Sequence, residues 1–344
     1  MATAENAKIQ YESGQDLVPF VALTDQGDHQ EFLSADTMWS NRAGYQPEVR
    51  PNGLATGGRV TAGVSGSDNK IDVAALTCYL GGALESVLAS ADETVVRPTG
   101  GSPANTHNKS SVTITSAGAI SIVKGVDGTE HSTTRGAAGG PPYILPGSIE
   151  IAQIWLSAAA DDAISSDEIK QVVGTHCERY DYPTWTEKRF NVEAGILLNA
   201  GIEFAAALPL IHSEASPVSP VPKAVYAQYY EPAFADVPKS SDFVPPETTH
   251  SVSSTQIYGT TLASSSESLN QGSFNAYLED GISDGLLYCK NQDLFFKFFQ
   301  NRLNSTPYIL MQGKLGISRT FPAGDQIQAA CTISSETAGA DVIG

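Results

Sequence analysis

Residues 308–333 read YILMQGKLGISRTFPAGDQIQAACTI, two strand-length segments separated by a turn sequence. Successive side chains of a strand point to opposite faces, so every second residue shares a face. One face collects the apolar residues of both segments, namely Ile309, Met311, Leu315, Ile317, Ile327, Ala329, Cys331 and Ile333. The sequence PAGD at 322–325 favours a tight turn. The pattern predicts an antiparallel strand pair with one buried face and one neutral-polar face.

The same alternation extends over much of the chain. Residues 111–124 alternate on both sides of Ala117 and Gly118, which predicts a β-hairpin. Further strands are expected at residues 148–156, 224–230 and 273–279. We therefore expect a mainly β protein.

Three segments have a different pattern. Residues 286–299, LLYCKNQDLFFKFF, fit either a helix with a wide apolar side or a pair of strands, and we expect the helix. Ser165 and Glu168 have the spacing of a capping box, which predicts a short helix over residues 165–173. Residues 71–90 fit a helix and a buried strand equally well.

Composition and charge exclude several functional classes. The 344 residues include 38 acidic and 20 basic side chains, for a formal net charge of −18. Affinity for nucleic acid comes largely from clustered Lys and Arg. No such cluster occurs, so we expect no electrostatic binding of nucleic acid. No apolar run is long enough to span a membrane, and residues 1–15 lack a secretion-signal pattern, so we expect folding in a cytoplasm.

Interruptions of the strand pattern predict the domain organisation. Residues 1–60 carry many glycines and prolines and are expected to form an arm with little regular structure. A β-rich domain is expected over residues 61–212. Residues 213–222, SEASPVSPVP, contain three prolines and predict a linker. A second β domain is expected over residues 223–344.

The expected arm carries four aromatic residues that need a surface to bury them: Phe20, Phe32, Trp39 and Tyr45. Our first interpretation is that they pack on their own domain. The alternative is that the arm docks on a neighbouring copy of the chain, which would make these residues inter-subunit contacts.

One motif resembles a catalytic pattern. GISDG at 281–285 matches GxSxG around Ser283, but the triad His of an α/β-hydrolase follows its Ser in the chain. The last histidine here is His250, which precedes Ser283 in the chain. We therefore expect residues 281–285 to form a turn, and we expect no catalytic residues.

Metal-ligating residues are not expected either. The six histidines are isolated, and the acidic stretch from Asp161 to Glu168 lacks the glycine and ligand spacing of an EF-hand loop. The four cysteines lie far apart, without a CxxC pair, and are expected to be reduced and buried. No phosphate- or dinucleotide-binding motif occurs, so we expect no cofactor.

The stretch from His250 to Thr337 resembles the carboxy-terminal half of bacteriophage major tail tube proteins. The similar features are GSFNAYLEDG at 272–281, the two long final strands with their turn, and a last strand rich in Thr and Ser. Three segments also look like tail proteins of long, non-contractile-tailed phages of Gram-negative bacteria: DVAALTCYLGG at 72–82, GAAGGPPYILPGSIEIAQI at 136–154 and FPAGDQIQAACTIS at 321–334.

The resemblance implies a tail-tube-type antiparallel β-sandwich or barrel with one or two short flanking helices. In that family, subunits form rings with a continuous inner β-barrel, and stacked rings make the tube for genome ejection. The implied protein is a structural virion component without enzymatic activity. Its implied partners are copies of itself, the tape-measure protein, the tail terminator and distal tail proteins. Its implied location is the virion tail, after assembly in the cytoplasm of the host bacterium.

The length of the chain leaves two ring architectures open. A duplicated tube domain, split near Ser213, would give a trimer with pseudo-sixfold symmetry, which is our first expectation; a single tube domain with a decoration would give a hexamer. In either ring, DNA would pass through an acidic and neutral-polar lumen without specific binding. The candidate lumen-facing residues are Gln312, Lys314, Gln326 and Gln328.

A different class of function stays open as an alternative. A capsid decoration or a receptor- or glycan-binding phage protein would use the Ser/Thr/Gly-rich surface for recognition. Such proteins usually gather aromatic side chains on loops, whereas Trp39, Trp155 and Trp185 are scattered along this sequence. A hydrolase acting through Ser283 is a third hypothesis.

Overall fold

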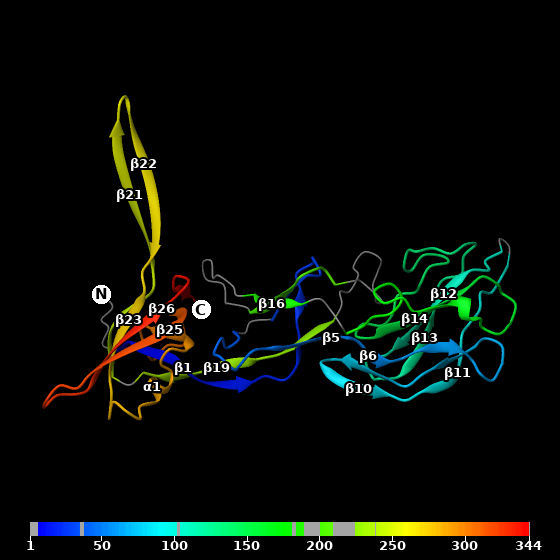
Figure 1. The fold of residues 1–344 in the computed structure, drawn as a ribbon, viewed down its shortest axis with the longest axis horizontal. Coiled ribbons are helices and arrows are strands. Elements are labelled where there is room, and N and C mark those ends of the chain that lie inside the picture. The colour runs from blue at the N-terminus through cyan, green and yellow to red at the C-terminus, as the bar shows by residue number, and fades with distance from the viewer. Residues whose placement is uncertain are drawn as a thin grey trace.

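The computed structural model describes residues 6–34, 38–101, 104–180, 184–188, 200–208, 224–237 and 239–343. The described chain is mainly β, and its strands pair in antiparallel sheets, which confirms the expected fold class. The two short helices with described bounds are the 3₁₀ turn η2 (Ser166–Glu168) and α1 (Gly285–Tyr288). The sheets fall into three groups along the long axis of the molecule (Figure 1).

The first group lies at one end and combines the first strand with strands from the last third of the chain. Its main sheet has the order β19-β1-β24-β25-β26-β23-β20, and β27 also pairs with β25. The strands are β1 (Lys8–Leu17), β19 (Tyr230–Asp236), β20 (Ser240–Val244), β23 (Gly272–Tyr277), β24 (Asp293–Phe299), β25 (Tyr308–Thr320), β26 (Gln328–Ser334) and β27 (Ala340–Val342). A separate hairpin, β21 (Thr248–Ile257) and β22 (Thr260–Leu269), projects away from this sheet (Figure 1).

The second group lies at the opposite end and consists of three sheets around one core. Their orders are β10-β9-β6, β11-β8-β7 and β13-β12-β14-β15. The strands are β6 (Gly53–Gly57), β7 (Val60–Ala62), β8 (Lys70–Val73), β9 (Leu76–Leu80), β10 (Ala83–Val87), β11 (Ser90–Thr94), β12 (Asn108–Ile114), β13 (Ile120–Lys124), β14 (Ile149–Leu156) and β15 (Ile169–Lys170). Fully buried Ile71, Ile114, Ile151 and Ile154 lie in this core.

The third group lies between the other two (Figure 1). Its sheets have the orders β16-β17-β4-β3 and β2-β18-β5. The strands are β2 (Val21–Ala22), β3 (Thr24–Asp25), β4 (Glu31–Leu33), β5 (Glu48–Pro51), β16 (Trp185–Lys188), β17 (Gly201–Phe204) and β18 (Val225–Gln228). The chain therefore runs outward from β1 to the second group and returns to the first.

The expectation of an irregular amino-terminal arm is wrong for the described part of residues 1–60. Strand β1 lies inside the first sheet, between β19 and β24, and Ile9 and Tyr11 are buried in its core. Of the glycines and prolines that suggested an arm, Gly27, Gly44 and Pro47 lie between strands, whereas Pro51, Gly53 and Gly57 lie within the short strands β5 and β6. Because the partners of β1 are more than 200 residues away, local sequence carried no sign of this pairing. The expected linker, residues 213–222, lies outside the described residues, so that domain boundary stays a prediction.

The helix expected over residues 286–299 is also wrong. Only Gly285–Tyr288 is helical, and Asp293–Phe299 forms β24. Leu294 and Phe296 face the main core, while Phe295 belongs to a second buried cluster on the opposite face of the sheet. A strand buried on both faces has a continuous apolar run, which hides the period of two.

Other local expectations can now be compared with the strands. The hairpin predicted for residues 111–124 is confirmed as β12 and β13, with Ile114 opposite Ile120. The strands predicted at 148–156 and 273–279 are confirmed as β14 and β23. Residues 71–90, which fitted either class, lie mostly in strands β8 to β10. The helix expected over 165–173 ends already at Glu168, because β15 follows directly and pairs with β14.

Candidate functional site

The final strands carry the polar face on which the candidate lumen residues were placed. Lys314 lies opposite Ser334 and Thr320 lies opposite Gln328 in the register of β25 and β26. Along β26, Gln328, Ala330, Thr332 and Ser334 are exposed and alternate with buried residues. This surface, which we call the polar face, consists of Lys314, Ser318, Thr320, Gln328, Ala330, Thr332 and Ser334. Gln326 is exposed just before β26.

Gln312 does not share this surface. Its Nε2 atom is buried and has no hydrogen-bond partner in the described part of the chain. In the register it lies opposite Phe295, which packs with Leu310 and Val342 in a small apolar cluster. The side chain of Gln312 is half-buried beside this cluster, and its lumen-facing position stays a prediction. The lumen assignment of Lys314, Gln326 and Gln328 stays a prediction.

The same covered region also buries a positive charge. Lys297 Nζ lies 4.0 Å from the ring centroid of Phe234 and 5.2 Å from that of Tyr308. Burial lowers the pKa of Lys297 and raises the pKa of Tyr308. Part of the face opposite the main core is therefore covered by aromatic and aliphatic side chains.

The hairpin β21–β22 is the most exposed element among the described residues. It has ten residue pairs, from Thr248–Leu269 to Ile257–Thr260. The side chains of residues 249–256 and 263–268 are all exposed. On one face three pairs of hydroxyl groups are hydrogen-bonded, Thr249–Ser268 at 3.0 Å, Ser251–Ser266 at 2.7 Å and Ser253–Ser264 at 2.8 Å. Sequence reasoning did not single out this hairpin, although two Ser/Thr-rich stretches flank the turn residues Tyr258 and Gly259.

The main sheet of the first group curves around its core and leaves two outer strands. Val237, just after β19, donates its N–H to the Ile9 carbonyl at 2.8 Å, and Lys239, just before β20, accepts the Tyr277 N–H at 3.1 Å. Strand β19 pairs only with β1, and β20 only with β23, among the strands that the structure describes. Each therefore presents an open edge that can accept a further strand.

Two of the four aromatic residues of the expected arm lie inside the chain's own core. Phe32 is fully buried against Phe204, with ring centroids 5.7 Å apart, and Trp39 stacks on Tyr229 at 4.9 Å. An inter-subunit role is therefore corrected for Phe32 and Trp39, because no surface of either ring is available to another molecule.

The other two aromatic residues of that set are half-buried. Phe20 lies under the Arg50 guanidinium, and Tyr45 packs edge-on against Tyr230 at 5.0 Å. Both keep accessible surface, so a contact with a neighbouring copy stays a prediction for Phe20 and Tyr45.

Ser283 lies in a turn, as expected. Asp280 accepts hydrogen bonds from the N–H groups of Ile282 and Ser283 at 2.7 Å each, and the Ser283 hydroxyl also donates to Asp280. These three hydrogen bonds hold the pKa of Asp280 well below its usual range, and the bond from the Ser283 hydroxyl has the largest effect. Asp284 accepts from the N–H groups of Glu279 and Gly281 at 2.8 Å. The hydroxyl is thus bound to a carboxylate that organises a turn.

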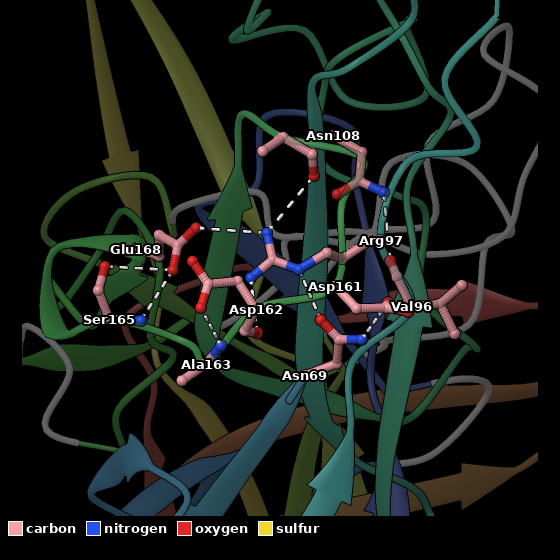
Figure 2. A network of polar contacts seen from close by, with 10 residues as sticks. Asn69, Val96, Arg97, Asn108, Asp161, Asp162, Ala163, Ser165 and Glu168 are labelled. Atoms are coloured by element: carbon pink, nitrogen blue, oxygen red, sulfur yellow. Dashed lines mark hydrogen bonds and ion pairs between the residues drawn. The ribbon is translucent and has the colours of Figure 1, made fainter. Parts of the chain in front are cut away.

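The acidic stretch from Asp161 to Glu168 takes part in a network around Arg97 (Figure 2). Arg97 is 7% exposed; Nε donates to Asn69 Oδ1 at 2.5 Å and Nη2 donates to the Asp162 carbonyl at 3.0 Å. Its Nη1 lies 3.8 Å from Glu168, whose carboxylate also closes the capping box with Ser165. These contacts attach the loop before β15 to the strands β8 and β11.

The remaining candidates can be placed briefly. All four cysteines are free and buried, as expected, and burial raises the pKa of Cys78 to about 11 and that of Cys331 to about 12. Within the described ranges, no group of three or more His, Cys, Asp or Glu side chains is arranged to hold a metal ion. None of the helices described is both long and apolar enough to cross a membrane.

Comparison with known proteins adds no assignment. No protein-family model, no curated protein and no solved structure matches this chain. The resemblance to tail tube proteins therefore stays a prediction from the sequence.

Proposed function

We propose that this chain is a structural subunit that assembles with copies of itself into stacked rings, and that these rings form the tail tube through which a phage genome is delivered. The observation that carries the proposal is the hairpin β21–β22, whose ten residue pairs extend away from the sheet of its own chain (Figure 1).

A hairpin of this kind calls for contacts outside its own chain. An isolated two-stranded hairpin is marginally stable in water, because neither face is covered. Both outer edges of β21 and β22 also carry N–H and C=O groups without strand partners in the described structure. Its surface is rich in hydroxyl groups, so a polar partner suits it better than an apolar groove.

The open edges of the main sheet support the same proposal. A copy of the chain could pair its β20 with β19 of its neighbour, since both edges lack a second partner among the described strands. Repetition of such a contact around a closed ring would leave no exposed edge. Ring closure is thus a physical solution to an aggregation hazard that a single copy retains.

The charge of the chain supports passage of DNA without retention. The net charge of −18 repels phosphate, and the polar face contributes only one charged side chain, Lys314. A lumen lined by this face would present hydroxyl and amide groups. These groups form hydrogen bonds with water and would not bind a passing DNA duplex tightly.

The test is electron microscopy of the purified chain over a concentration series, with a variant that lacks the hairpin. In this variant Asn-Gly replaces residues 249–268, so that Thr248 and Leu269, which already pair, are joined by a tight turn. We expect rings with a central hole and stacked tubes from the native chain. The shortened chain should keep its circular dichroism spectrum and thermal transition but form no tubes.

The matched control is His250→Gln, which keeps the length and both edges of the hairpin. It should form tubes like the native chain. Monomers of the native chain at every concentration would contradict the proposal, and tubes of the shortened chain would show that the hairpin does not carry it. End-on views would distinguish three chains per ring from six.

A further inference from the structure

Residues 125–147, which we call the strap, lie across one face of strands β12 and β14 in the second group of sheets. Gly125 N–H donates to the Lys109 carbonyl at 3.1 Å, and His107 and Gly128 exchange two backbone hydrogen bonds of 3.0 and 2.8 Å. A Cβ atom on Gly125 would lie 2.3 Å from the Lys109 carbonyl oxygen. The strap thus runs in direct backbone contact with β12.

The strap covers a polar face of the sheet. In the register of β12 and β14, Lys109 lies opposite Trp155, Ser111 opposite Gln153 and Thr113 opposite Glu150. The polar members of this set are at most 3% exposed, namely Lys109, Ser111, Thr113, Glu150 and Gln153. Buried polar groups destabilise a fold unless they form hydrogen bonds or ion pairs. The stability of the closed strap therefore depends on the partners of these side chains.

One half of the polar layer is well paired. Arg135 of the strap donates through Nη2 to Glu150 Oε2 at 2.7 Å, and Glu150 also accepts from the Ser111 hydroxyl and, at 3.2 Å, from Gln153 Nε2. Gln153 in turn accepts from Trp155 Nε1 at 3.0 Å. This chain of contacts connects the strap to the indole ring.

The other half is a cluster of cationic and titratable groups around that ring. Lys109 Nζ lies 3.6 Å from the Trp155 centroid, and the rings of His131 and His176 lie 5.6 and 5.5 Å from it. His107 packs edge-on against His131 at 4.8 Å. We call His107, His131 and His176 the histidine cluster. His131 belongs to the strap, while the other two precede β12 and follow β15.

Hydrogen bonding requires a neutral imidazole at His176. His176 is 8% exposed, and its Nδ1 accepts the Val172 N–H at 3.3 Å, which it can do only while Nδ1 carries no proton. His131 Nδ1 is buried and has no partner in the described structure. Burial is the main cause that lowers the pKa of both residues; Lys109 adds to it for both, and His107 adds to it for His131.

The charges around the cluster come from every element that packs there. Lys109 on β12 and Lys170 on β15 are positive, and Lys170 Nζ lies 5.6 Å from the Trp155 centroid. The carboxylates bind other groups: Glu150 binds Arg135, Asp127 binds Lys124 and Asn108, and Glu178 accepts from the Glu150 N–H. A proton added to His131 or His176 would therefore place a second cation near Lys109.

We propose that the histidine cluster is an acid-sensitive latch: above about pH 6.5 the neutral imidazoles let the strap pack on β12 and β14, and protonation of His131 and His176 at lower pH releases the strap. Release would expose Trp155, Lys109 and Lys170, a cationic and aromatic surface on an otherwise acidic chain.

The direction of the effect follows from proton linkage. The pKa of both histidines is lower in the closed state than in a solvated state, so the released state binds more protons as the pH falls below about 6.5. The closed state loses stability in that window and loses no more once the pH is below the closed-state pKa values. Each such proton changes the opening equilibrium about tenfold per pH unit, and two protons change it about a hundredfold.

The first test is hydrogen–deuterium exchange of the full chain at pH 7.5 and 5.0, expressed as protection factors so that the intrinsic pH dependence cancels. We expect protection in residues 125–147 to fall at least tenfold at pH 5.0. The double variant His131→Gln, His176→Gln cannot take up these protons and should keep its protection at both values. His250→Gln, at an exposed position on β21, should behave like the native chain. Equal native protection at both pH values would overturn the latch, and so would a fall that persists in the double variant.

A second measurement uses the native chain, so it does not depend on folding of the variants. Heteronuclear spectra of ¹³C-labelled imidazoles report the titration of each histidine. The latch requires that His131 and His176 titrate below about pH 6.5, the ordinary value of a solvated imidazole. Titration of both at or above that pH would overturn it.

Discussion

At the scale of single residues, the second group of sheets depends on buried charges whose partners are backbone atoms. Arg97 joins the Asp162 carbonyl, the Ala158 carbonyl and Asn69 into one network, and Glu168 lies at its edge (Figure 2). The planar guanidinium suits this role because it presents several N–H donors in fixed directions. A lysine could not reach the same acceptors together.

The replacement Arg97→Met tests that role. It keeps the aliphatic part of the side chain but leaves the Asn69 amide oxygen and two carbonyls without their donor, so we expect a loss of about 2–3 kcal/mol in the free energy of unfolding. Urea unfolding measures the change. Arg302→Met, at an exposed position, is the matched control and should change the free energy of unfolding by less than about 0.5 kcal/mol. Equal effects of the two variants would show that the network contributes nothing beyond packing.

At the scale of elements, β24 connects the amino- and carboxy-terminal parts of the chain. It pairs with β1 on one side and β25 on the other, and both of its faces are covered. Phe296 is fully buried next to Phe274, with ring centroids 6.1 Å apart. The position of β1 in the sheet therefore depends on this strand, although the two are nearly 300 residues apart.

Truncation of the buried ring should destabilise the whole first group. For Phe296→Ala we expect a loss of about 3–5 kcal/mol in the free energy of unfolding, because a large cavity opens in the main core. Phe321→Ala, where the ring is 57% exposed, should cost less than about 1 kcal/mol. Exchange of the β1 amides should increase with Phe296→Ala and not with Phe321→Ala. A small effect at Phe296 would mean that the core collapses around the smaller side chain.

At the scale of the whole molecule, an elongated chain with a net charge of −18 must approach copies of itself against electrostatic repulsion. Surfaces rich in Ser, Thr and Gly reduce this repulsion only at the contacts. Salt reduces it everywhere, because it shortens the distance over which charges act.

Assembly should therefore increase with ionic strength. A rise from about 0.01 M to about 0.15 M salt shortens the Debye length from about 30 Å to about 8 Å. We expect the fraction of assembled protein to increase over this range at constant protein concentration, as measured by sedimentation velocity. The chain without residues 249–268 should form no tubes at any salt concentration in this range. A decrease with salt would indicate that opposite charges hold the copies together.

The sequence alone determined the features that depend on residues close to one another in the chain. Alternation with a period of two was sufficient for the hairpin of β12 and β13, for β14, and for the buried sides of β23, β25 and β26, because one face of each of these strands meets a core. The turn at Ser283 followed from the turn-forming residues Gly, Ser and Asp, and the side chain of Asp280 accepts hydrogen bonds from two nearby N–H groups.

Only the tertiary structure decided the features that depend on distant partners. Strand β1 is a strand because β19 and β24 flank it, and β24 escaped prediction because it is buried on both faces. Gln312 is half-buried, with its Nε2 atom enclosed, because it lies beside Phe295 in the register of β24 and β25. The histidine cluster assembles from three segments, around a tryptophan on a fourth. Alternation records which side of a strand is buried locally; it does not record which remote segment covers the other side.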